Sequence, residues 1–232
     1  MKVLAIDIGG SHVKPLVSGE TEKRAFASGS ELAPAQMVKQ IRKLTTDWSY
    51  KAISIGYPGL VIHGRIASEP HNLATGWVGF DFSAAFGCPV KIINDAAMQA
   101  LGSYDGKRML FLGLGTGLGS ALIFDGRLEP MELAHLPYRK GRTYEDYIGE
   151  VGLKRLGKRK WRKHVWAVVE ILSKALEPDY VVVGGGNARR LDEPPPGVRL
   201  GDNANAFKGG FRLWQEAGGK PTAEATAPQS GG

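Results

Sequence analysis

The first residues that could do chemistry follow the apolar run at the start of the chain. Asp7 is followed by Gly9, Gly10 and Ser11, and Lys14 comes three residues after the serine. A carboxylate can hold a hydrated Mg²⁺, glycine N–H groups can approach an oxyanion closely, and a hydroxyl and an ammonium can add further bonds to phosphate. This set suits a polyanion, although a hairpin turn with a capping aspartate would also account for it.

Two further glycine clusters lie at expected strand ends. One is in residues 113–120 (GLGTGLGS), at the turn between two apolar runs, and the other follows residues 180–183 (YVVV). We expect the second cluster to begin a helix, whose free N–H groups and dipole favour an anion. The candidate donor-contacting residues are Gly115, Thr116, Gly117, Gly185, Gly186 and Asn187.

Two pairs of polar residues are candidates for the acceptor side of a reaction. Asn94 and Asp95 follow an apolar strand, so Asp95 could accept the proton of a hydroxyl nucleophile while Asn94 holds another hydroxyl. A simple N-cap is the alternative for this pair. Glu132 and His135 are three residues apart, which on one helical turn would let both grip a polyol. A helix-end or core histidine is the alternative for His135.

Composition excludes several classes of protein. The chain has 232 residues, 43% of them apolar, and its only cysteine is Cys88, so it is neither disulfide-stapled nor able to form a cysteine-based zinc site. No run of about 18 apolar residues is present, so we expect no membrane span and a cytoplasmic location.

The net charge of +7 comes from one segment. Residues 154–163 hold seven Lys or Arg, and without them the chain has 23 basic and 23 acidic residues. Lys158, Arg159 and Lys160 could form a cationic track for a linear polyanion. A solvated helix face or a patch that attracts nucleic acid is the alternative.

Short β-rich runs alternate with helical ones, which predicts an α/β fold. The expected strands are 2–7, 13–18, 22–28, 51–57, 89–93, 108–113, 118–124 and 180–183. The expected helices are 33–46, 95–104, 161–176 and 203–216. Two rounds of strands, each opening with a glycine-turned hairpin, predict two lobes with the ligand between them. We expect an N-terminal lobe over 1–105, a C-terminal lobe over 106–216 and a disordered tail over 217–232.

An ordered set of motifs resembles the ROK family of sugar kinases, and its spacing is most similar to that of polyphosphate glucokinases. The motifs begin at residues 7 (DIGGSHVK), 54 (SIGYPGLV), 71 (HNLATGW), 92 (IINDAA), 113 (GLGTGLGSALIFDGRL), 132 (ELAH) and 181 (VVVGGGN). The resemblance implies an α/β, two-lobed actin/hexokinase-like (ribonuclease H-like) fold with the active site in the interlobe cleft.

The resemblance also implies a role for each candidate residue. Asp95 would be the general base that deprotonates the 6-hydroxyl of glucose, and Asp7 would position Mg²⁺ through water. The sugar-binding set would be Gly59, Gly76, Trp77, Asn94, Glu132 and His135. The donor-binding set would be Gly9, Gly10, Ser11, Lys14, Gly115, Thr116, Gly117, Gly185, Gly186 and Asn187, with Lys158, Arg159 and Lys160 added for polyphosphate.

The implied activity is a glucokinase that uses polyphosphate, ATP or both. A kinase for mannose, fructose or an N-acetylated sugar is one alternative, and a non-catalytic protein that binds a sugar or a polyanion is another. No cysteine follows the Glu132–His135 motif, so we expect no zinc. The first strand begins at residue 2, so we expect no DNA-binding domain, and the resemblance suggests a homodimer.

Overall fold

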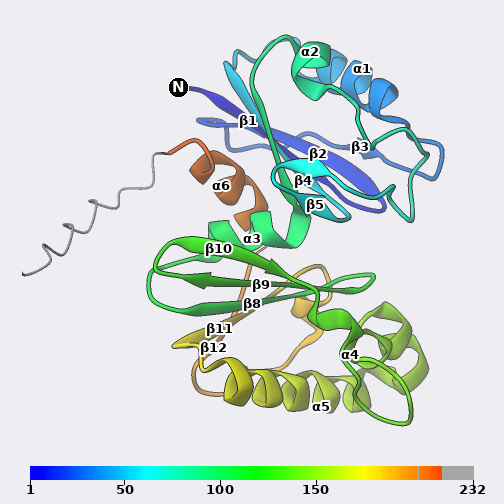
Figure 1. Ribbon diagram of the computed structural model, residues 1–232, viewed down its shortest axis with the longest axis vertical. Coiled ribbons are helices and arrows are strands. Elements are labelled where there is room, and N and C mark those ends of the chain that lie inside the picture. The colour runs from blue at the N-terminus through cyan, green and yellow to red at the C-terminus, as the bar shows by residue number, and fades with distance from the viewer. Residues whose placement is uncertain (203, 216–232) are drawn as a thin grey trace, which may run out of the picture.

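The structure is a computed structural model of the chain that describes residues 1–202 and 204–215. Two five-stranded sheets form two lobes (Figure 1). In spatial order, the first sheet contains β3 (Phe26–Ala27), β2 (His12–Val17), β1 (Val3–Ile8), β4 (Ala52–Tyr57) and β7 (Val90–Asn94). The second contains β10 (Arg127–Met131), β9 (Leu118–Phe124), β8 (Met109–Leu114), β11 (Tyr180–Gly184) and β12 (Val198–Leu200). A separate two-stranded sheet joins β5 (Val61–Ile62) to β6 (Arg65–Ile66).

The two large sheets repeat one topology. β1 pairs antiparallel with β2 and parallel with β4, which pairs parallel with β7. β8 pairs antiparallel with β9 and parallel with β11, which pairs parallel with β12. The two predicted glycine-turned hairpins are therefore confirmed. Residues of β1 and β4 are almost all buried, which is why they read as continuous apolar runs.

Six α-helices and two single 3₁₀ turns complete the described chain. They are α1 (Pro34–Leu44), α2 (Phe82–Phe86), α3 (Asp95–Ser103), α4 (Tyr144–Ile148), α5 (Glu150–Leu176), α6 (Asn205–Arg212), η1 (Leu133–His135) and η2 (Ala188–Arg190). None of the helices in residues 1–202 and 204–215 is long and apolar enough to cross a membrane.

Two helix predictions differ from the structure. α5 begins eleven residues before Trp161, at Glu150, with a kink where Gly157 adopts φ 71° and ψ 155°. The charged residues before Trp161 conceal this first segment, because they interrupt its apolar pattern. The prediction of a helix that begins at Asn187 is wrong, since only the 3₁₀ turn η2 follows that residue. No helix dipole therefore supports anion binding at the third glycine cluster.

α6 returns the chain to the first sheet. The Ser54 hydroxyl of β4 donates to the carbonyl of Gly210 at 2.5 Å and accepts from the Trp214 indole N–H at 2.9 Å. The predicted lobe boundary at 105/106 groups α6 with the second lobe. In the structure α6 packs on β1, β4 and α3, so it lies with the first sheet. The predicted tail 217–232 lies outside the described residues.

α3 and α6 touch backbone to backbone, next to the junction of the lobes. A Cβ on Gly102 would lie 1.8 Å from the carbonyl oxygen of Asn205, and a Cβ on Gly209 would lie 1.8 Å from that of Met98. On another side α3 packs against the second sheet, where Ala96 and Ala100 share a buried cluster with Phe111. α3 is thus the element that both lobes contact.

We predict that Gly102→Ala lowers the free energy of unfolding by about 2 kcal/mol or more, because the added methyl group forces α3 and α6 apart. In an unconstrained helix interior the same change stabilises by about 1 kcal/mol. The sign of the change in urea denaturation therefore tests the contact, and a stabilised variant would contradict it.

Candidate active site

A cavity of about 760 Å³ lies between the lobes, and we call it the interlobe cavity. Its walls come from the carboxyl ends of strands in both sheets and the loops that follow them. From the predicted set it is lined by Gly10, Gly59, Asn94, Asp95, Gly115, Thr116, Gly117, Glu132, His135, Gly185 and Gly186. Crevices at the carboxyl ends of strands are the usual ligand sites of open α/β sheets.

Asp95 is the first residue of α3, directly after β7. The side-chain oxygen of Asn94 caps this helix, accepting from the N–H groups of Ala96 at 2.9 Å and Ala97 at 3.1 Å. The Asn94 amide donates to the carbonyl of Gly59 at 3.1 Å. The N-cap alternative for Asn94 is therefore present, with its oxygen already engaged, and the residue holds Asp95 and the Gly59 loop in place.

The carboxyl group of Asp95 has an unusual electrostatic environment. Burial, followed by the nearby negative charge of Asp7, raises the pKa of Asp95 to about 7. Burial also raises the pKa of Asp7, against the opposing effect of Lys14, whose Nζ lies 3.7 Å from the Asp7 carboxylate. Asp7 and Asp95 come together because β1 and β7 both flank β4 and run parallel to it.

The donor set around Asp7 fits a hydrated Mg²⁺. Lys14 is the one cation paired with the Asp7 carboxylate among the described residues, and the charge of Asp95 adds to the local negative potential. Mg²⁺ typically binds one or two carboxylates and completes its shell with water and phosphate oxygens. Within residues 1–202 and 204–215 no group of three or more His, Cys, Asp or Glu could hold a metal ion.

The first glycine loop has only one residue on the interlobe cavity. Gly10 lines it, whereas Gly9 makes the tight turn of the hairpin, donating its N–H to the carbonyl of His12 at 2.9 Å. Ser11 and Lys14 do not line the cavity, and Lys14 points to Asp7. The loop therefore offers one glycine to an anion in the interlobe cavity, whereas the Lys14 ammonium pairs with Asp7.

The second glycine loop is shaped by a residue that the sequence did not single out. Glu145 of α4 accepts from the N–H of Leu118 at 3.0 Å, and a Cβ on Gly117 would lie 2.1 Å from its carboxylate. A larger residue at Gly117 would therefore displace the Glu145 carboxylate from its present position. The sequence signal is the capping pattern of Thr143 and Asp146, which begins α4 and sets the position of Glu145.

Asn187 holds the second loop instead of lining the cavity. Its amide donates to the carbonyl of Gly115 at 3.1 Å and to the carboxylate of Glu150 at 2.9 Å. Gly185 has φ 83°, and a Cβ there would lie 2.4 Å from the carbonyl oxygen of Leu114. Gly185 and Gly186 line the cavity and Asn187 does not; its amide supports the loop, and its predicted contact with a donor stays a prediction.

Glu132 and His135 face the cavity together. Their Oε2 and Nε2 atoms lie 3.9 Å apart, and both side chains are exposed. The expected shared helical turn is the 3₁₀ turn η1. Ser120, which the sequence analysis missed, fixes this turn by donating to the carbonyl of Met131 at 2.7 Å and accepting from the N–H of Leu133 at 3.2 Å.

Trp77 belongs to the core of the first lobe and does not line the interlobe cavity. It is 0% exposed, and its ring packs against those of Tyr57 and Phe82. Gly76 does not line the cavity either, and its φ of 96° marks a turn. From the same motif, His71 and Asn72 line the cavity in their place. The large apolar surface of Trp77 explains its burial.

Lys158, Arg159 and Lys160 are exposed on α5 and line no part of the interlobe cavity. Lys160 lines a second, smaller cavity.

Comparison with known proteins identifies the family of the chain. The model of the ROK family matches residues 3–130. The chain belongs to the ROK family. A polyphosphate glucokinase of Mycobacterium tuberculosis is 28% identical over 212 residues, which are 82% of this chain and 80% of that protein.

Other ROK relatives match the chain in fold or in part. The crystal structure of an inorganic polyphosphate/ATP-glucomannokinase from Arthrobacter sp. strain KM superposes with a TM-score of 0.74 at 25% identity, covering 90% of this chain and 96% of that one. The bifunctional enzyme NanE/NanK of Brucella melitensis is 34% identical over 141 residues, which are 54% of this chain and 27% of that enzyme. The fold is the actin/hexokinase-like fold of ROK glucokinases.

We predict that Asp95→Asn stabilises the protein above pH 7. The raised pKa of Asp95 means that stability is lost as pH rises from about 4, the ordinary value, to about 7, where the folded protein ionises. The neutral amide avoids this loss, so the variant should gain about 1–3 kcal/mol at pH 8 and nearly nothing at pH 4. Urea denaturation at both pH values measures it, and a pH-independent difference would rule out the raised pKa.

Proposed function

We propose that this protein is a glucokinase that transfers a phosphoryl group from polyphosphate, ATP or both to the 6-hydroxyl of glucose. The observation that carries the proposal is Asp95, a carboxyl group with a pKa of about 7 in a cavity that it shares with the glycine loop around Thr116. The 28% identity to a polyphosphate glucokinase supports the same activity.

Asp95 acts as the general base. Near neutral pH about half of its carboxyl groups are ionised, and a base with a pKa close to the working pH is well suited to remove a hydroxyl proton. As the sugar oxygen forms its bond to phosphorus, the bond from phosphorus to the donor's bridging oxygen breaks and the hydroxyl proton moves to the Asp95 carboxylate. The Asn94 cap keeps that carboxylate at the start of α3.

The remaining residues of the cavity bind and orient. The N–H of Gly115 donates within the loop to the carbonyl of Gly117 at 3.1 Å. The N–H groups of Gly10, Thr116 and Gly117 and the Thr116 hydroxyl are therefore the donors proposed for phosphate oxygens. Glu132, His135 and the Gly59 loop bind sugar hydroxyls. Mg²⁺, when bound through water at Asp7, supplies positive charge to the phosphoryl oxygens.

The main test is formation of glucose 6-phosphate from glucose and Mg²⁺, run in parallel with ATP and with polyphosphate and coupled to NADP reduction. Product with either donor supports the proposal, and the ratio of the two rates identifies the preferred donor.

Asp95→Asn should lower kcat by a factor of about 10³ or more while glucose binding, measured by calorimetry, changes little. A variant that keeps its activity would remove Asp95 from the role of base.

The donor preference depends on the exposed cations of α5. We predict that Lys158→Gln/Arg159→Gln/Lys160→Gln raises the KM for polyphosphate about tenfold or more and the KM for ATP less than twofold, because only a long polyanion reaches beyond the cavity. Steady-state kinetics at fixed ionic strength measures both constants. Equal effects on the two donors would show that these residues form a solvated helix face and do not bind polyphosphate.

An N-acetylated hexose is the second candidate acceptor, and the 27% identity over 144 residues to an N-acetylmannosamine kinase of Salmonella paratyphi A favours it. Initial rates on glucose, mannose, fructose and N-acetylmannosamine distinguish the two. Turnover of N-acetylmannosamine alone would replace glucose in the proposal. Sugar binding without turnover of any of the four would favour a non-catalytic binding protein.

A further inference from the structure

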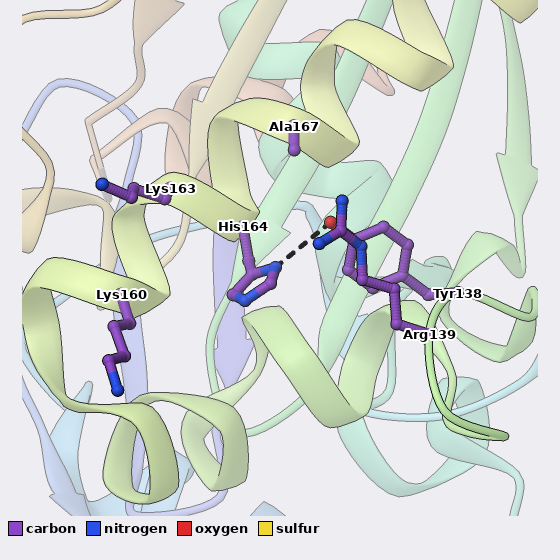
Figure 2. Close-up of a pocket in the computed structure, with 6 residues that line it drawn as sticks. All are labelled: Tyr138, Arg139, Lys160, Lys163, His164 and Ala167. Atoms are coloured by element: carbon purple, nitrogen blue, oxygen red, sulfur yellow. Dashed lines mark hydrogen bonds between the residues drawn. The ribbon is translucent and has the colours of Figure 1, made fainter.

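A second cavity of about 300 Å³ lies between α5 and the loop that precedes α4 (Figure 2). We call it the α5 pocket. It is lined by Tyr138, Arg139, Lys160, Lys163, His164 and Ala167, none of which lines the interlobe cavity. Of these residues, only Lys160 is among the cations assigned to polyphosphate in the proposed function.

One face of α5 forms the floor of the pocket. Its four lining residues, from Lys160 to Ala167, follow the spacing i, i+3, i+4 and i+7, which places them on one side of a helix. Trp161, Val165 and Val168, each next to one of them in sequence, are 0% exposed because they face the core of the second lobe. The core face and the pocket face of α5 are thus distinct.

An aromatic cluster holds the other wall of the pocket in place. The Tyr138 hydroxyl lies 3.1 Å from Nδ1 of His164, and the Tyr147 ring packs edge-on against both residues, with centroids 5.0 Å and 4.7 Å away. The loop closes on itself through the N–H of Tyr138, which donates to the carbonyl of Arg142 at 2.8 Å. A wall fixed in this way makes the pocket preformed, so a ligand need not order it.

The charge of the pocket is entirely positive. Arg139, Lys160 and Lys163 line it, no carboxylate does, and none of the three has a carboxylate of residues 1–202 or 204–215 within 4.0 Å. Three other cations of the same helix are neutralised, in the pairs Lys154–Glu150, Arg162–Asp192 and Lys174–Glu170. Arg155, Lys158 and Arg159 have no carboxylate of the described residues within 4.0 Å, so the pocket lies in a wider strip of uncompensated cations on α5.

We propose that the α5 pocket is a second phosphoanion site, which holds a segment of inorganic polyphosphate. Ammonium, guanidinium and phenol groups are donors that suit phosphate oxygens. A nucleic acid is disfavoured, because the rings of Tyr138 and Tyr147 are packed against each other and against His164, whereas bases need open ring faces to stack upon. The choice of polyphosphate rests on the proposed function, whereas the binding of an inorganic phosphoanion does not.

His164 provides a reporter inside the pocket. Burial, followed by the positive charges of Arg139 and Arg155, lowers the pKa of His164. The charged groups around it are Arg139 from the loop and Arg155, Lys160 and Lys163 from its own helix, while α4 contributes only the Tyr147 ring. A phosphoanion bound here adds the missing negative charge, so binding should favour protonation of the imidazole.

The test follows the five histidines by NMR in ¹⁵N-histidine-labelled full-length protein, with His164 assigned from the His164→Gln variant. The probe is inorganic tripolyphosphate at constant ionic strength. We predict that saturating tripolyphosphate raises the pKa of His164 by about one unit, a tenfold gain in proton affinity. An unchanged His164 titration would overturn the proposal.

Two matched variants separate the site from general charge effects. Arg139→Gln/Lys163→Gln should abolish the response of His164 to tripolyphosphate. Lys39→Gln/Lys43→Gln removes the same charge from the exposed face of α1 in the other lobe and should leave the response intact. Equal loss of the response in both double variants would show a long-range charge effect and overturn the site.

The outcome is independent of the proposed function. If the protein phosphorylates no sugar but shows the His164 response, the anion site is supported and the kinase proposal is overturned. If the protein makes glucose 6-phosphate without the His164 response, the kinase proposal is supported and the anion site is overturned. RNA oligonucleotides that shift the pKa of His164 at lower concentration than tripolyphosphate would replace polyphosphate as the ligand.

Discussion

The backbone contact between α3 and α6 is the constraint on which the rest of the structure depends. Glycines at positions 102 and 209 let the two helices approach until a single methyl group would overlap a carbonyl oxygen. α6 is bonded to the first sheet through Ser54, and α3 packs against the second sheet through Ala96 and Ala100. Because α3 begins with Asp95, the same contact that joins the lobes also sets the position of the candidate base.

The position of Asp95 lowers the stability of the folded protein and gives the site a carboxyl group that titrates near neutral pH. A carboxyl group that is removed from water beside another carboxylate resists ionisation, so its pKa lies about three units above the ordinary value. The fold tolerates this because Asn94 and the first N–H groups of α3 hold the segment from the other side. Site residues that weaken a protein while giving it a group that titrates near neutral pH are typical of active sites.

Much of the fold could be predicted from the sequence because its signals are local. Apolar runs marked the buried parallel strands, and glycine turns marked both hairpins at the right residues. The start of α5 was not predictable from periodicity, since Gly157 breaks the helix and charged residues interrupt the apolar pattern before Trp161. The helix expected at Asn187 failed because the glycines there serve close packing against Leu114 instead of opening a helix.

The sequence by itself determined the types and order of the candidate site residues: Asp95 after a buried strand, glycine turns after others, and seven cations in one segment. Only the tertiary structure decided which of them meet. Asp7 approaches Asp95 because β1 and β7 flank the same strand. Trp77 turns into the core because its ring is too large and apolar to leave in solvent, and Asn187 holds the Gly115 loop of its own lobe. Such contacts join residues that are distant along the chain, so no local pattern records them, whereas strand and turn signals arise from neighbours.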